Sequence, residues 1–142
     1  MKKLLLILMI GVVFMSCAKE DKVAVISTKF GNMIVEFYDD VAPMHVESFK
    51  ILADEGYFNK TTFHRVIPGF VIQGGDPNSK DDDRMNDGTG GRAGKFFGIG
   101  REDDPASWNL PAEFNNKEHV KGTLSMARSS NPNSGSSQFF IC

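Results

Sequence analysis

The chain has 142 residues, of which 41% are hydrophobic and 24% are charged, values typical of an ordinary globular protein. This length predicts one domain that is large enough to bury a hydrophobic core. The net charge is −2 at pH 7, and no stretch of the sequence gathers basic residues. Because nucleic-acid binding needs a clustered basic face, composition argues against that class of function.

The first segment predicts an export signal rather than a part of the fold. A positively charged start precedes the apolar run Leu4–Met15, which is shorter than the ~20 residues of a comfortable membrane-spanning helix. A serine followed by Cys17 ends this run and resembles the lipobox of bacterial lipoproteins. We therefore expect 1–17 to be a signal peptide with Cys17 as the lipidation site, 18–22 a tether, and 23–142 the folded domain. A plain secretory signal or an uncleaved anchor is the alternative.

The first elements of the domain are predicted to be a hairpin and a helix. Val23–Tyr38 contains two β-rich runs around Lys29–Asn32, which has turn chemistry. Downstream, apolar residues recur at spacings of three and four over Val46–Asp54, and Gly56 follows them. This pattern predicts an amphipathic helix of ~10–12 residues with a charged, solvated face.

The rest of the domain is predicted to be mainly β. Residues 61–67 and 70–75 are strand-like and flank a Pro-Gly turn. Asp76–Ala106 is rich in glycine and aspartate and predicts a long loop. Two further short strands are expected in Gly122–Ala127 and Ser137–Ile141. Many strands with one or two helices indicate a barrel or a sandwich.

Familiar ligand motifs are absent from the sequence. A phosphate-binding loop would need glycine at Thr89 and serine or threonine at Phe96. A calcium loop would need aspartate or asparagine at Met85. The histidines are too far apart in sequence for a compact metal-binding pattern; they are His45, His64 and His119. We expect neither a metal nor a cofactor.

Four segments together resemble the cyclophilin-type peptidyl-prolyl cis–trans isomerases. They are "FHRVIPGFVIQGGDP" (Phe63–Pro77), "DGTGG" (Asp87–Gly91), "PAEFN" (Pro111–Asn115) and "GTLSMARSSNPNSGSSQFFIC" (Gly122–Cys142). The resemblance covers 23–142 and implies a mainly-β, closed antiparallel barrel capped by helices. In the family a second helix and further strands follow, so the resemblance also implies that the C-terminal part of the fold is missing here.

The chemistry of this family has simple requirements. Rotation about a peptide bond faces a barrier of ~18–20 kcal/mol because amide resonance is lost. X–Pro bonds therefore interconvert only over tens to hundreds of seconds. In the twisted state the nitrogen regains a lone pair and the carbonyl oxygen loses negative charge. A catalyst needs a donor near that nitrogen and an apolar pocket for the proline ring, without a nucleophile, a base or a metal.

The resemblance assigns the donor role to Arg65, the arginine of the F-H-R motif. A guanidinium has a fixed charge and a planar fork that suit preorganisation. A structural ion pair is the alternative, because an arginine among apolar residues must find partners for its donors. The resemblance also implies a set of substrate-binding residues: Phe70, Val71, Gln73, Gly88, Ala127, Arg128, Ser129, Gln138 and Phe140.

Strand alternation supports part of this assignment. Side chains two positions apart share a face, so Val71 lies with Gln73 and Gln138 lies with Phe140. Phe139 then faces the core. Taken singly, a strand phenylalanine is more often core than pocket, and only the joint pattern favours a site.

The sequence thus predicts an isomerase that acts on X–Pro bonds of extracytoplasmic proteins. The expected partners are proline-containing peptides and folding proteins, with a monomeric protein lipid-anchored to a bacterial membrane. The alternative function is a binding module that holds proline-containing or unfolded segments without turnover. Loss of activity with retained peptide binding in an Arg65→Ala variant would favour catalysis.

Overall fold

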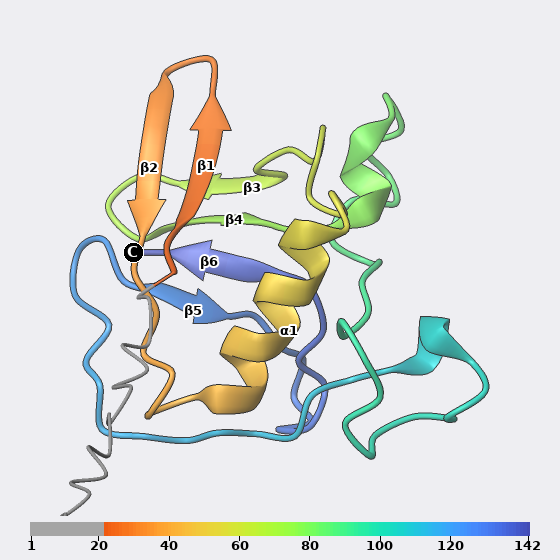
Figure 1. Cartoon of the computed structure of the whole chain (residues 1–142). Coiled ribbons are helices and arrows are strands. Elements are labelled where there is room, and N and C mark those ends of the chain that lie inside the picture. Colours follow the sequence, from red (N-terminus) through yellow and green to blue (C-terminus); the bar gives the residue numbers. More distant parts are fainter. Residues whose placement is uncertain (1–21) are drawn as a thin grey trace, which may run out of the picture.

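A computed structural model describes residues 22–142, which form two β-sheets and one long helix (Figure 1). The predicted signal peptide and Cys17 lie outside the described residues. The strands are β1 (Ala24–Thr28), β2 (Gly31–Val35), β3 (Arg65–Ile67), β4 (Val71–Gly74), β5 (Leu124–Met126) and β6 (Phe139–Ile141). The helices are α1 (Pro43–Asp54) and two short 3₁₀ turns, η1 (Pro77–Lys80) and η2 (Pro105–Ser107).

The predicted hairpin is confirmed. β1 and β2 pair antiparallel, and Thr28 lies opposite Gly31 at the turn. Gly31 has φ +126°, a conformation that L side chains rarely adopt. The Thr28 hydroxyl donates a 3.0 Å hydrogen bond to the Gly31 carbonyl and closes the turn.

The predicted helix is confirmed and begins with an unusual cap. Pro43 occupies the first turn, where its missing N–H costs nothing. No side chain of the helix's own N-cap residue satisfies the next amides. Instead, the Glu113 carboxylate accepts hydrogen bonds from the amides of Met44 (3.0 Å) and His45 (2.9 Å). A residue far along the chain therefore fixes the start of α1.

The four-stranded sheet brings together distant parts of the chain. Its strand order is β3-β4-β6-β5, and every neighbouring pair is antiparallel. The predicted strands are confirmed, although each is shorter than its β-rich run. Residues 61–64, for example, precede β3 as irregular backbone. β6 enters the sheet between β4 and β5, as Figure 1 shows.

The expected closed barrel is not found within residues 22–142. β1 and β2 pair only with each other, while β3 and β5 are the two edges of a separate sheet. Closure requires that every strand edge be paired with a neighbour. The described part of the chain is therefore a mainly-β fold of two open sheets with one long helix.

An aromatic cluster joins α1 to the four-stranded sheet. The Phe139 ring on β6 lies 5.6 Å from that of Phe49 on α1 and 5.8 Å from that of Phe58. The Phe63 ring, just before β3, lies 6.3 Å away. Phe139 is buried, as strand alternation predicts.

Among residues 22–142, no helix has the length and apolar character needed to cross a bilayer.

Candidate functional site

Four side-chain positions form one row across the four-stranded sheet. Arg65 on β3 lies directly opposite Gln73 on β4, and Gln73 lies opposite Phe140 on β6. Phe140 in turn lies opposite Ser125 on β5. Because directly opposed residues of an antiparallel pair project to the same face, the sheet register alone gathers these side chains.

A chain of hydrogen bonds runs beside this row. The Arg65 guanidinium donates to Gln73 Oε1 (3.3 Å), and Gln73 Nε2 donates to Gln138 Oε1 (3.0 Å). Gln138 Nε2 donates to two backbone carbonyls, those of Gly88 (3.0 Å) and Gly90 (2.7 Å). Gln138 is only 8% exposed, so its amide is held firmly.

Arg65 itself is exposed, which differs from the expectation of an apolar environment. Its guanidinium makes no ion pair with the acidic residues of the described chain, so the structural ion pair is not found there. Gln73 occupies one edge of the guanidinium fork. The remaining N–H groups are free to serve a bound molecule.

These residues line a broad depression of about 1760 Å³. Its lining includes the face of the sheet that carries Arg65 and Phe140, and it extends to Phe139 on the opposite face and to Phe49 on α1. The predicted site residues that line it are Arg65, Gln73, Gly88, Ala127, Arg128, Ser129, Gln138 and Phe140. The structure therefore gathers in one place residues that are far apart in sequence.

Two predicted pocket residues do not line this depression. Phe70 follows the turn between β3 and β4 and is 62% exposed. Its backbone amide donates to the Ile67 carbonyl (3.0 Å), which places it in the turn itself. Val71 lies on the same strand face as Gln73 but is buried, with 6% exposure. Val71 therefore borders the Arg65 row along the sheet, whereas Phe70 belongs to the turn.

The segment after β5 forms the rim of the depression opposite Arg65. The Ala127 amide donates to the Gln138 carbonyl (2.9 Å) and so extends the pairing of β5 with β6. The Ser129 amide donates to the Ser134 hydroxyl (2.9 Å). The Arg128 guanidinium lies over the Phe114 ring, 5.8 Å from its centroid, and donates to the Ser129 carbonyl. The rim thus presents a cation beside an exposed aromatic ring.

Sequence reasoning missed two features of the site. His119 packs its ring against Phe140 at 5.4 Å in an edge-to-face arrangement. Its place in an irregular segment gave no periodic signal. Asp76 is fully buried beneath the glycine-rich segment, although its sequence neighbours indicated only a loop. The short motif in which a proline follows Asp76 was the one available signal, because it is typical of a capped turn.

The described residues contain no group of three or more side chains arranged to hold a metal ion. This face offers the Arg65 guanidinium, two oriented amides and the Phe140 ring, with a second cation, Arg128, at the rim. Such a set can hold an apolar ring and donate a hydrogen bond to a weak acceptor beside it.

Comparison with known proteins identifies relatives of this chain. The family model "Cyclophilin type peptidyl-prolyl cis-trans isomerase/CLD" matches residues 23–142. A Brucella abortus protein named "Probable peptidyl-prolyl cis-trans isomerase" is 42% identical over 126 residues, which cover 89% of this chain and 60% of the relative. The "Peptidyl-prolyl cis-trans isomerase" of Synechococcus elongatus is 39% identical over 119 residues, covering 84% of this chain and 67% of that protein.

A solved structure is also similar. The crystal structure of a Cryptosporidium parvum cyclophilin-type peptidyl-prolyl cis-trans isomerase, determined in the presence of the dipeptide Ala-Pro, superposes with a TM-score of 0.67. The two chains are 32% identical, and the match covers 84% of this chain and 66% of that one. The chain thus spans about 60% of the length of the Brucella relative and about two thirds of the Cryptosporidium chain.

Proposed function

The chain belongs to the cyclophilin-type peptidyl-prolyl cis–trans isomerase family, and on this premise we propose that it catalyses rotation about X–Pro peptide bonds. One observation carries the proposal. The exposed Arg65 guanidinium lines the depression with one edge bonded to Gln73 and without an acidic partner among residues 22–142. A structural arginine would be expected to use its donors within the protein.

The proposed mechanism is stabilisation of the twisted amide. The proline ring rests against Phe140, and a free N–H of Arg65 donates to the prolyl nitrogen as its lone pair develops. This bond exists only while the amide is twisted, so it lowers the barrier without tightening ground-state binding. Gln73 limits the rotation of the guanidinium, so that little reorganisation is needed during the reaction.

The rim after β5 is the proposed binding edge for the peptide backbone. The amide and carbonyl of Arg128 form no hydrogen bond with the rest of the described chain. An extended peptide lying along this edge could pair with both groups, as in strand addition. The Ala-Pro dipeptide present with the Cryptosporidium relative supports a proline-containing ligand for this chain.

The test is a protease-coupled isomerisation assay on an Ala-Pro-Phe peptide with the full-length protein. Arg65→Ala should lower kcat/KM about 100-fold, because a single preorganised donor contributes that order of rate enhancement. Arg101→Ala is the matched control, since the Arg101 side chain is exposed and bonds only to Asp104 in its own turn. Unchanged turnover in Arg65→Ala would remove Arg65 from the mechanism.

The second candidate function is a binding module for proline-containing or unfolded segments. The breadth of the depression favours it, because 1760 Å³ exceeds the ~300–1,000 Å³ of a usual small-ligand pocket. Isothermal titration of the same peptide separates the two functions. A protein that binds the peptide and shows no turnover would be a binding module.

We also propose that the protein acts in the cell envelope as a lipid-anchored monomer. The lipobox-like stretch that ends at Cys17 supports this proposal. A Cys17→Ser variant should move from the detergent phase to the aqueous phase on Triton X-114 partitioning, because it loses its acyl chains. Equal partitioning of the variant and the wild type would contradict lipidation. Sedimentation of the detergent-free Cys17→Ser form tests the monomeric state.

A further inference from the structure

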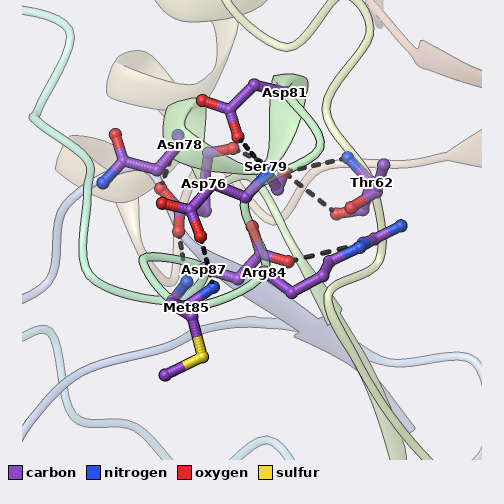
Figure 2. A network of polar contacts seen from close by, with 10 residues as sticks. Thr62, Asp76, Asn78, Ser79, Asp81, Arg84, Met85 and Asp87 are labelled. Atoms are coloured by element: carbon purple, nitrogen blue, oxygen red, sulfur yellow. Dashed lines mark hydrogen bonds and ion pairs between the residues drawn. The ribbon is translucent and has the colours of Figure 1, made fainter.

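Asp76 is a buried carboxylate that lies outside the depression and yet connects to it. Its side chain is completely shielded from solvent. Oδ1 accepts a hydrogen bond from the Asn78 amide (2.9 Å), and Oδ2 accepts one from the Gly88 amide. Figure 2 shows Asp76 beside Asn78 and Ser79 at the start of η1. The carboxylate therefore joins this turn to the glycine-rich segment Asp87–Gly91.

The same glycine-rich segment determines the orientation of Gln138. The Gly88 and Gly90 carbonyls both accept from Gln138 Nε2, so the amide nitrogen must face this segment. The Gln138 oxygen then faces Gln73 and can only accept. Gln73 must donate with its nitrogen, and this leaves its own oxygen as the acceptor for Arg65. Two backbone carbonyls thus fix the direction of every bond up to the guanidinium.

The glycine-rich segment has little room to shift. A Cβ atom at Gly90 would lie 2.6 Å from Asp76 Oδ1, well below any real contact distance. A Cβ atom at Gly91 would lie 2.6 Å from the Ser137 hydroxyl on the other side. The backbone therefore packs directly between Asp76 and the residues that precede β6. Small displacements at Asp76 are transmitted rather than absorbed.

We propose that Asp76 is a positioning residue for Arg65, acting through the glycine-rich segment and the two glutamines. This inference rests on the proposed isomerase function. Asp76 touches no substrate; it holds the segment that orients Gln138. Without it, the glutamine amides lose their fixed direction, and the guanidinium loses the acceptor that aims it at the prolyl nitrogen.

Asp76→Asn tests the proposal with minimal change of shape. An asparagine keeps one acceptor and turns an NH₂ group toward the other backbone N–H, so one of the two contacts becomes repulsive. We expect kcat/KM to fall about 10-fold or more, mostly through kcat, because misplacement of a catalytic group lowers the rate more than it weakens binding. Asp81→Asn is the matched control, since Asp81 is exposed and bonds only to the Asp83 amide.

A double-mutant cycle separates positioning from a general loss of stability. In a Gln138→Ala background the connection to Arg65 is already broken, so Asp76→Asn should cause no further loss of kcat/KM. Independent, multiplicative losses in the double variant would overturn the proposal. So would an Asp76→Asn variant with the kinetics of the wild type.

A second variant and an NMR measurement distinguish a positioning role of Asp76 from failed folding or an inactive protein. If Asp76→Asn does not fold by circular dichroism, Gly90→Ala is the substitute: it keeps the carboxylate but pushes the same segment away from it, and the same loss is expected. The NMR signal of the Arg65 Nε–H should shift in Asp76→Asn and stay unchanged in Asp81→Asn. This signal needs no turnover: an inactive wild type would contradict the proposed function, whereas an unmoved signal would contradict the role of Asp76.

Discussion

At the residue scale, Tyr57 shows how the surroundings of one side chain set its acid–base behaviour. Two cations lie over its ring, with Lys80 Nζ 5.3 Å and the Arg92 guanidinium carbon 5.1 Å from the ring centroid. Partial burial raises the pKa of the phenol above its ordinary value of 10.0, and a hydrogen bond with Ser137 and the charge of Arg92 offset part of this rise. The folded protein therefore retains the phenolic proton more strongly than the unfolded chain does.

This difference predicts a pH dependence of stability. Because the folded-state pKa is the higher one, the contribution of Tyr57 is fully present below pH 10.0 and is lost as the pH rises through the folded-state pKa. Tyr57→Phe should therefore lose less stability than the wild type as the pH rises above 10.0. Urea titrations across this range measure the two slopes, with Tyr38→Phe as the control. Identical slopes for the wild type and Tyr57→Phe would show that this proton is not retained.

At the scale of single elements, two adjacent phenylalanines of strand β6 lie in different environments. Phe139 is buried among the rings of Phe49, Phe58 and Phe63, whereas Phe140 lies on the face of the Arg65 row, beside His119. Neighbouring residues of a strand point to opposite faces. Core packing and the proposed substrate contact are therefore separated by one position in the sequence.

Substitution of each residue should give opposite results. Phe139→Ala should lower the free energy of unfolding by about 3–5 kcal/mol, because it removes a large buried ring. Phe140→Ala should cost much less stability but reduce kcat/KM for proline peptides about 10-fold or more. Denaturant titration and the peptide assay measure both variants. Equal losses of stability would mean that Phe140 belongs to the core rather than to the site.

The glycine-rich segment offers a second test at this scale. Gly91 and Gly31 have nearly the same φ, +128° and +126°. A Cβ atom at Gly31 meets nothing within 4 Å, whereas one at Gly91 overlaps the hydroxyls of Ser136 and Ser137. Both alanine variants should therefore carry about 1–3 kcal/mol of backbone strain, and Gly91→Ala should lose more stability than Gly31→Ala. Thermal unfolding compares them, and matching losses would show that the serines move aside.

At the scale of the whole molecule, Glu113 connects α1 to the segment that leads toward β5. Its carboxylate accepts from the two amides at the start of α1, where it also opposes the positive end of the helix dipole. The His45 ring adds a 3.0 Å hydrogen bond with the Pro111 carbonyl across the same contact. These hydrogen bonds therefore stabilise both the start of α1 and the position of the segment that contains Pro111 and Glu113.

Glu113→Gln should weaken this connection without removing the side chain. One amide oxygen replaces two carboxylate oxygens, and the charge at the helix terminus is lost, so we expect a loss of about 0.5–2 kcal/mol. Glu102→Gln, at an exposed position, is the control. Denaturant titrations of both variants give the difference. A Glu113→Gln variant as stable as the control would show that water satisfies these amides equally well.

Local signals predicted the hairpin, α1 and the four strands of the larger sheet, because turn residues and apolar spacing act over a few positions. The grouping of Arg65 with Gln73 and Phe140 came from the family resemblance. The contacts of Glu113 with α1 and of Asp76 with Gly88 were not predicted, since the partners lie 68–69 and 12 positions away and follow no period. The expected barrel failed for the described residues for a related reason: closure depends on edge pairing, which sequence periodicity does not encode.

The hydrogen bond between Gln73 and Gln138 joins residues 65 positions apart, and this separation has a kinetic consequence. The entropy of closing so long a loop must be overcome before the bond can form, which places it late among folding events. Arg65 is thus oriented only after β6 has docked beside β4. During synthesis on the ribosome, Arg65 is therefore present long before its guanidinium is oriented by the glutamines. In refolding experiments, isomerase activity should accordingly return with the slowest phase that orders β6, after the signal of α1 has recovered.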